Sequence, residues 1–331
     1  GFTSTFFLIF FFLAFFSEVD LTFLTNSYLK GLFLNTVILS FSSALLSALI
    51  AVPLAILITF YKFPGHNFFS WALSLSIAFP AYVYAFIFVG IFEYASPISE
   101  FLRALNISLP SIKNIYGATV IMSMALFPYI FLLTKAQLSS VGVGIFKAAK
   151  SLGSNNLSAI RKVILPSLWP AVIAGMALVI FETISDFGGV STLRVETFTV
   201  GIYDAWFGYQ SYFSAAKLAG YLLLFVFFIV FITKYFGANS NTLASKTAET
   251  FEKIELNKFN QCVISVTCFL IFVLVFCIPI IQLLVWHFNN PLFNVSESLY
   301  LLFNSSILGF CAALFTVFFA MALSLSYKNN S

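Results

Sequence analysis

The sequence predicts an all-α membrane protein that crosses the bilayer several times. Of its 331 residues, 61% are hydrophobic and only 8% are charged, and its mean hydropathy is +1.01. A span needs about 20 apolar residues to cross roughly 30 Å of hydrocarbon. Lipid cannot satisfy the open edge of a strand, and the apolar runs here are too long and too little alternating for barrel strands. This composition excludes a soluble domain.

Eight apolar runs account for the expected spans. Their approximate bounds are 5–16, 32–60, 67–92, 116–134, 167–185, 214–236, 261–286 and 300–326. The first run is short, and neither Met nor basic residues precede it. It therefore indicates a helix cut at its N-terminal end rather than a signal peptide. Pro53 and Pro80 fall inside runs, where a proline is expected to kink the helix.

The basic residues orient these spans. If the segment after the second run faces the cytoplasm, inside segments hold eleven of the 16 Lys and Arg residues and outside segments hold five. This distribution follows the positive-inside rule. Because the same bias explains the net charge of +4, the charge indicates a lipid bilayer as partner and gives no indication of nucleic acid.

A polar interval and an internal repeat divide the chain. Residues 237–260 are rich in Ser, Thr, Asn, Lys and Glu, and we interpret them as a cytoplasmic linker. Asn35–Leu45 aligns without gaps on Asn304–Leu314, with six of eleven positions identical. We therefore expect a duplication in parallel orientation. The first module, 1–236, has six spans and the second, 261–331, stops after two, so the chain resembles a fragment of a protein of about twelve spans.

The loop between the fourth and fifth runs has a specific pattern of alanine, glycine and proline residues. Its marked positions are Lys147, Ala148, Ala149, Gly153, Leu165 and Pro166. Paired alanines, a glycine and a Leu-Pro at this spacing predict a helix, a glycine break, a second helix and entry into the next span. The charge distribution places the loop in the cytoplasm. A plain basic connector is the alternative interpretation.

This loop resembles the EAA loop of the permeases of ABC importers, which docks on the ATPase subunit. The resemblance implies that Ala148, Ala149 and Gly153 form a coupling element and that ATP binds to a separate ATPase dimer. Lys147 stands where the family usually has Glu, a change that would weaken or retune docking.

The next stretch extends the resemblance. Phe181–Val190 contains Glu-Thr-Ile-Ser-Asp-Phe-Gly, and Glu196–Tyr203 reads Glu-Thr-Phe-Thr-Val-Gly-Ile-Tyr. Both resemble the permeases of ferric-iron importers. The resemblance implies the MetI-like fold of the methionine and maltose permeases over about 31–236, a bacterial inner membrane, and a periplasmic binding protein that delivers ferric iron. Thiamine permeases share the fused architecture, and polyamine, sulfate and molybdate permeases share the loop.

Two carboxylates close to a span core are candidates for the translocation pathway. Glu182 and Asp186 lie four residues apart, hence on one helix face. An acidic side chain in the bilayer costs roughly 2.5–3.5 kcal/mol, so it indicates function. The alternative is that Glu182 pairs with a neighbouring helix and Asp186 meets water. Phe187, Gly188 and Gly189 break the helix and form either a hinge that lines the cavity or a plain loop.

Nothing in the sequence indicates a resident metal or an enzyme. The cysteines at 262, 268, 277 and 311 have no metal-ligand spacing, and His66 and His287 are expected on opposite sides of the membrane. There is no phosphate-binding loop motif, so we expect ATP hydrolysis in another subunit and no cofactor in this chain. An ion-coupled secondary transporter that uses Glu182 and Asp186 as a relay is the alternative from a different class.

Overall fold

The computed structural model describes residues 26–139, 143–237, 253–289 and 295–329. Contacts divide the chain into two compact units, Gly1–Gln282 and Leu283–Ser331. Every predicted site residue belongs to the first unit. The predicted short run at 5–16 lies outside the described residues.

The helices confirm a multi-pass membrane protein. Six of those described are long and apolar enough to cross a bilayer: Ser27–Phe60, Ala81–Ala104, Ile115–Gln137, Tyr212–Phe231, Lys258–Asn289 and Val295–Met321. A pair of helices, Asn156–Ser167 and Trp169–Ser185, bends by 57° and makes a seventh span if it is counted as one. These elements match six of the eight predicted runs in position, and the third run, 67–92, overlaps the span Ala81–Ala104 only in part.

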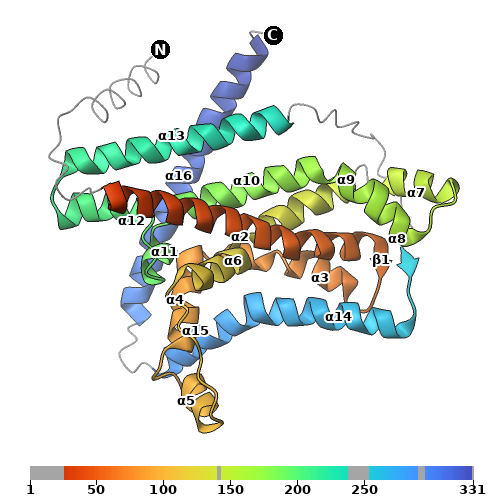
Figure 1. Cartoon of the computed structure of the whole chain (residues 1–331), viewed down its shortest axis with the longest axis horizontal. Coiled ribbons are helices and arrows are strands. Elements are labelled where there is room, and N and C mark those ends of the chain that lie inside the picture. Colours follow the sequence, from red (N-terminus) through yellow and green to blue (C-terminus); the bar gives the residue numbers. More distant parts are fainter. Residues whose placement is uncertain (1–25, 140–142, 238–252, 290–294, 330–331) are drawn as a thin grey trace. The chain divides into compact units, whose positions relative to one another are not determined.

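Three helices form the centre of the first unit (Figure 1). They are α2 (Asn26–Phe60), α6 (Ile115–Gln137) and α10 (Trp169–Ser185). The buried side of α2 carries small residues, which let helix backbones approach closely in a membrane. These residues are Thr36, Ser40, Ser43, Ala44, Ser47 and Ala51.

Hydrogen bonds and one glycine hold these helices close together. The Ser42 and Thr119 hydroxyls lie 2.8 Å apart, and the Ser123 hydroxyl donates to the Ser43 carbonyl at 3.1 Å. A Cβ placed on Gly175 of α10 would lie 2.8 Å from the Ile130 Cα of α6, so only glycine fits there without a shift. The α2–α6–α10 core therefore combines close contacts between small residues with large buried apolar side chains such as Leu39, Phe127 and Val179.

The predicted continuous span at 67–92 is wrong. The chain there forms separate pieces: α3 (His66–Ala72), a 3₁₀ turn η1 (Leu75–Ala78) and α4 (Ala81–Phe92), followed by α5 (Pro97–Ala104). Proline disfavours the helical conformation in the residue before it, and Phe79 is accordingly extended (φ −100°, ψ 124°). Pro80 thus precedes a new helix instead of kinking one, whereas Pro53 lies inside α2.

The remaining elements of the first unit frame the predicted sites. The loop contains α7 (Val143–Ser151), α8 (Asn156–Ala159), the π turn η3 (Ile160–Ile164) and α9 (Leu165–Ser167). After α10 come α11 (Gly188–Thr192), α12 (Phe198–Tyr203), the π turn η4 (Asp204–Gly208) and α13 (Tyr212–Gly237). The Phe198 amide donates to the Thr36 hydroxyl at 3.0 Å, which ties α12 to α2.

The end of the predicted linker contains an element that an all-α prediction did not include. Strand β1 (Tyr61–Lys62) pairs in parallel with β2 (Ile254–Glu255). A long helical stretch then runs through α14 (Lys258–Phe272), the π turn η5 (Val273–Cys277) and α15 (Ile278–Asn289). The buried Tyr84 hydroxyl of α4 donates to the Val275 carbonyl in η5, so η5 packs on α4 within the first unit.

The second unit contains α16 (Val295–Asn329). Helices α2 and α16 both have 35 residues. The aligned asparagines of the predicted repeat, Asn35 and Asn304, each occupy the tenth position of their helix. This shared position fits a duplication, which stays a prediction.

Candidate functional site

The glycine break predicted in the polar loop is present. Gly153 has φ +85°, in the left-handed region that side chains other than glycine rarely adopt. Its amide donates to the Lys150 carbonyl at 2.9 Å, and the Ser154 amide donates to the Ala149 carbonyl at 3.1 Å. This pair of hydrogen bonds is the Schellman arrangement that ends a helix at glycine. The predicted order of helix, glycine break and helix is therefore confirmed.

One side of the loop is anchored and the other is exposed. Phe146 and Ala149 of α7 are buried, and the Phe146 ring lies 4.9 Å from the ring of Phe60, the last residue of α2. At the tip, Leu152 is 87% exposed and Leu157 is 74% exposed. Two large apolar side chains held outward on a fixed turn are typical of a contact surface for a partner.

The exposed side of the loop also carries its positive charges. Lys147, Lys150, Arg161 and Lys162 are exposed, as is Ala148. The loop therefore presents a basic surface around the apolar tip. Lys147 belongs to this surface, in the place where the resembling family has an acid.

The second half of the loop leads stiffly into the next span. The Asn155 side chain caps α8 by accepting from the Ser158 amide at 2.7 Å. Pro166 lies at the start of α9, where its missing N–H costs little. Leu165 and Pro166 are exposed at the bend before α10. The loop is thus a capped, folded hairpin joined to α10.

Glu182 and Asp186 lie together at a cavity of about 290 Å³. Its walls come from η1, α4, α6 and α10, and the lining residues are Ile77, Phe79, Pro80, Ala81, Tyr82, Ala125, Leu126, Tyr129, Glu182, Ser185, Asp186 and Phe187. The Tyr129 hydroxyl donates to Glu182 Oε1 at 3.3 Å. Glu182 is exposed in this chain and Asp186 is partly buried. The cavity therefore gathers oxygen atoms from two carboxylates, a phenol and the Ser185 hydroxyl.

Asp186 also has a local structural task. It ends α10 with an extended backbone (φ −70°, ψ 129°), and its Oδ2 accepts from the Val190 amide of α11 at 2.9 Å. Its carbonyl accepts from the Thr199 hydroxyl at 2.8 Å. Asp186 therefore holds three segments at the cavity edge, so the alternative in which it simply meets water describes only part of its environment.

The two glycines permit close packing behind this carboxylate. A Cβ on Gly188 would lie 2.8 Å from Tyr82 Cβ, and one on Gly189 would lie 2.7 Å from Asp186 Oδ2. Neither glycine lines the described cavity. The predicted helix break is present, and it starts the short helix α11. A hinge role for these residues stays a prediction.

An aromatic hollow adjoins the acidic cavity through Phe187. The Phe187 and Tyr203 rings stack with centroids 4.6 Å apart. Together with Trp206 and Phe207 they line a second cavity of about 350 Å³. The acidic and aromatic cavities thus share the Phe187 side chain as a wall.

Tyr129 was missed by reasoning from the sequence. A tyrosine hydroxyl within a membrane span needs a hydrogen-bond partner, and that need was the available signal. The partner, Glu182, lies 53 positions away along the chain, so only the fold identifies it.

A resident metal site is not formed by the side chains that the structure describes. Among these residues, no three of His, Cys, Asp and Glu gather closely enough to hold an ion.

The chain belongs to a family of membrane permeases. Residues 51–239 match the family described as the binding-protein-dependent transport system inner membrane component. This match includes the polar loop, both cavities, α6, α10 and the C-terminal end of α2. The family consists of membrane components of importers, in agreement with the resemblance noted in the sequence.

The names of the curated relatives refer to different transported substrates. The sulfate transport system permease protein CysT of Salmonella typhimurium is 27% identical over 166 residues, which cover 50% of this chain and 59% of the relative. The Fe(3+)-transport system permease protein FbpB 2 of Haemophilus influenzae is 26% identical over 275 residues, covering 81% and 51%. A putative 2-aminoethylphosphonate permease, PhnU of Salmonella choleraesuis, is 25% identical over 187 residues, covering 53% and 65%. The chain thus spans between about half and two thirds of these relatives.

The fold is also similar to a solved structure. A bacterial ABC transporter involved in the import of the acidic polysaccharide alginate matches with a TM-score of 0.57 and 14% sequence identity, over 71% of this chain and 89% of the matched chain. At this identity the likeness shows the fold alone.

Proposed function

We propose that this chain is part of the permease of a binding-protein-dependent ABC importer in a bacterial inner membrane. A periplasmic binding protein delivers the cargo to the outer face, and an ATPase dimer, which binds the ATP, docks on the polar loop. The chain itself catalyses no reaction. Family membership and the folded loop beside α10 support this proposal.

The loop is the coupling element in this proposal. Leu152 and Leu157 insert into the partner ATPase, and the basic side chains around them contact acidic groups of that partner. Because Phe146 packs on Phe60 and α9 leads into α10, displacement of the loop moves both α2 and α10. Closure of the ATPase dimer thereby switches the spans between inward-open and outward-open states.

The cargo that we propose is a cation, with ferric iron as the first candidate. The observation that carries this choice is the cavity that joins Glu182 and Asp186 with the Tyr129 phenol. Hard cations prefer such oxygen atoms, and two carboxylates would repel a sulfate or phosphonate dianion. The broad alignment with an Fe(3+) permease supports the same choice. Other relatives are named as sulfate permeases, so transport of an anion such as sulfate is the result that would contradict a cation cargo.

Organic cations are the second candidate because of the aromatic cavity. Phe187, Tyr203 and Trp206 lie next to the carboxylates, and aromatic faces attract quaternary and other organic cations. Thiamine and polyamines have this chemistry. An ion-coupled transporter is the remaining alternative, and it predicts uptake without ATP.

The test uses the complete gene with its ATPase and binding protein in lipid vesicles. We would measure ATP-driven uptake of radioactive ferric iron, sulfate and thiamine in the wild type and in Glu182→Gln. The control is Glu100→Gln, which removes one negative charge from the exposed helix α5. Loss of one charge contact of about 1.4 kcal/mol corresponds to a tenfold change in rate.

The outcomes separate the candidates. Iron uptake that requires ATP, falls about tenfold in Glu182→Gln and is unchanged in Glu100→Gln supports a cation pathway through this cavity. Thiamine uptake with the same pattern moves the assignment to organic cations. Sulfate uptake that improves in Glu182→Gln refutes the proposal that the cargo is a cation. Uptake that does not depend on ATP refutes the proposal that the protein is part of an ABC importer.

A further inference from the structure

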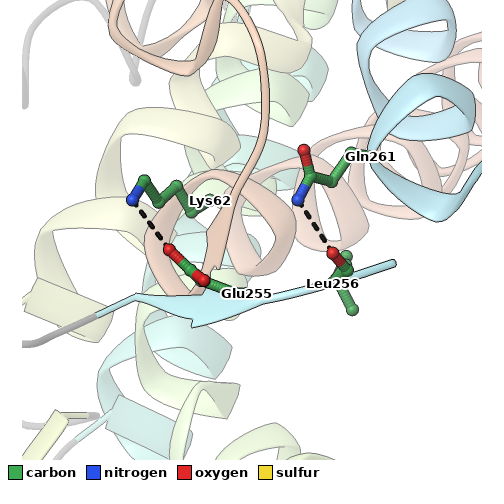
Figure 2. Close-up of polar contacts among 4 residues, drawn as sticks. All are labelled: Lys62, Glu255, Leu256 and Gln261. Carbon is green, nitrogen blue, oxygen red and sulfur yellow. Dashed lines mark hydrogen bonds and ion pairs between the residues drawn. The ribbon is translucent and has the colours of Figure 1, made fainter. Parts of the chain in front are cut away.

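The end of the linker returns to the end of α2 and pairs with the strand that follows this helix. In the parallel pair of β1 and β2, Tyr61 lies opposite Ile254, and Lys62 lies opposite Glu255. The Lys62 ammonium donates to Glu255 Oε1 at 2.8 Å, as Figure 2 shows. Both side chains are largely exposed, so this ion pair by itself holds little. A firmer anchor lies one residue earlier.

That anchor is Lys253. Its ammonium donates to the Ile58 carbonyl at 2.9 Å and contacts His66 Nε2. The pKa of Lys253 is lowered by burial and then by the nearby Lys135. The pKa of His66 is lowered by burial, then by Lys253 and Lys135. A partly buried ammonium must have acceptors in place, so these contacts fix where Lys253 lies.

Further contacts attach the start of α14 to the same region. Gln261 Nε2 donates to the Leu256 carbonyl at 2.8 Å, as Figure 2 shows. The Asn257 side chain caps α14 by accepting from the Asn260 amide at 2.9 Å. The Ser265 hydroxyl donates to the carbonyl of Pro64 at 2.7 Å. The segment 253–257 is therefore fixed at both ends.

The opposite side of this attachment reaches the polar loop. Phe60, which directly precedes β1, is fully buried and packs its ring on Phe146 of α7. An unbroken set of contacts thus leads from α7 through Phe60 to β1, from β1 to β2, and from β2 into α14. The two ends of this path, Phe146 and Lys258, are more than a hundred residues apart in sequence.

We propose that residues 253–257 form a tether that passes movement of the polar loop to the first span after the linker, with Lys253 as its positioning residue. This inference rests on the proposed function, because it needs a loop that moves with an ATPase. A polar linker transmits displacement only where it is fixed to what moves. The tether supplies that fixed point. It lets one loop drive spans on both sides of the linker.

Docking of the tether is tested first, in the full-length protein in membranes with its cysteines replaced by alanine. Opposed residues of paired strands lie within disulfide reach, so Lys62→Cys with Glu255→Cys should oxidise readily. The control pair combines Lys62→Cys with Lys258→Cys, which is out of register. We expect the control to form its disulfide about tenfold more slowly, because its Cβ atoms are not opposed. Equal rates would show that the tether is not docked.

Transmission is tested in vesicles with the ATPase and the binding protein. Lys253→Met keeps the aliphatic side chain but removes the ammonium, and exposed Lys258→Met is the matched control. We measure ATP hydrolysis and uptake of whichever cargo the wild type takes up among ferric iron, sulfate and thiamine. Lys253→Met should hydrolyse ATP normally while its uptake falls about tenfold. Oxidation of the Lys62→Cys, Glu255→Cys pair in that background should restore uptake.

Each outcome bears on the tether. Normal uptake in Lys253→Met, or loss that the disulfide does not restore, overturns the transmitting role. If Lys253→Met does not fold and reach the membrane, Ser265→Ala is tested instead. It removes the hydrogen bond to the Pro64 carbonyl, another contact of the same attachment. A wild-type complex without ATP-driven uptake overturns the proposed function and with it the transmitting role, whereas docking is decided by the disulfide rates alone.

Discussion

Replacing Gly153 by alanine isolates the backbone strain of the polar loop. Gly153 has φ +85°, and a Cβ added there would meet no atom within 4 Å. Steric crowding around the new methyl group is therefore negligible, and the left-handed backbone alone sets the cost. That cost is roughly 1–2 kcal/mol for an L-residue with a Cβ.

Gly144 offers a matched control in the same loop. It lies inside α7, and a Cβ added there also meets no atom within 4 Å. Because its backbone is helical, Gly144→Ala should stabilise the loop by roughly 0.5–1 kcal/mol. The two substitutions add the same methyl group and differ only in the backbone conformation that receives it.

The assay is the affinity of the ATPase for the permease in nanodiscs. The free Gly153→Ala loop relieves its strain by leaving the left-handed conformation, so docking must restore it at a cost of roughly 1–2 kcal/mol. Kd should therefore rise roughly 5–30-fold for Gly153→Ala. Gly153→Asn should have a smaller effect, because Asn tolerates the left-handed region. Equal Kd values for Gly153→Ala, Gly153→Asn and Gly144→Ala would refute a coupling role for this turn.

Two other predictions concern packing and pH. Gly175→Ala places a methyl group against the Ile130 backbone and should cost roughly 1–3 kcal/mol, seen as a lower Tm in detergent. Gly31→Ala, inside α2, meets no atom and should leave Tm unchanged or slightly higher. Lowering the pH from about 7.5 to 5.5 should lower the ratio of the disulfide rate of the Lys62→Cys, Glu255→Cys pair to that of the control pair, because protonated His66 cannot accept from Lys253. The loss of thiolate slows both pairs alike and cancels in this ratio. Since the pKa of His66 is lowered on folding, this contribution is intact above about 6.5 and is lost as the pH falls below that value. His66→Gln should remove this dependence, and a variant that keeps it would contradict the assignment.

The spans could be predicted because hydrophobic length alone decides whether a segment crosses a membrane. Among the described residues, the break at Pro80 escaped this reasoning, since apolar residues continue on both sides of it. A proline in a span signals either a kink or a new start, and the neighbouring Phe79 conformation, which the sequence does not state, decides between them.

The site was predictable where its signal is local. Gly153 and the Glu182–Asp186 pair are visible in short stretches of sequence, and the structure places each in a defined environment. Tyr129 and Glu182 are 53 residues apart in sequence, and Lys253 is at least 187 residues from its two partners, His66 and Ile58. No local sequence pattern indicates pairs so far apart. The β1–β2 pair is only two residues long on each side, too short for any periodicity to appear.

The hydrogen bond from Tyr84 to Val275 has a consequence for dividing this protein at the bench. A recombinant fragment that ends in the linker retains Tyr84 but loses η5, which leaves a buried phenol without its acceptor and uncovers the apolar surface around it. Such a fragment should aggregate or recruit lipid and detergent at that face. A fragment that extends through Asn289 keeps the helix that completes this packing and is the better choice for expression and crystallisation.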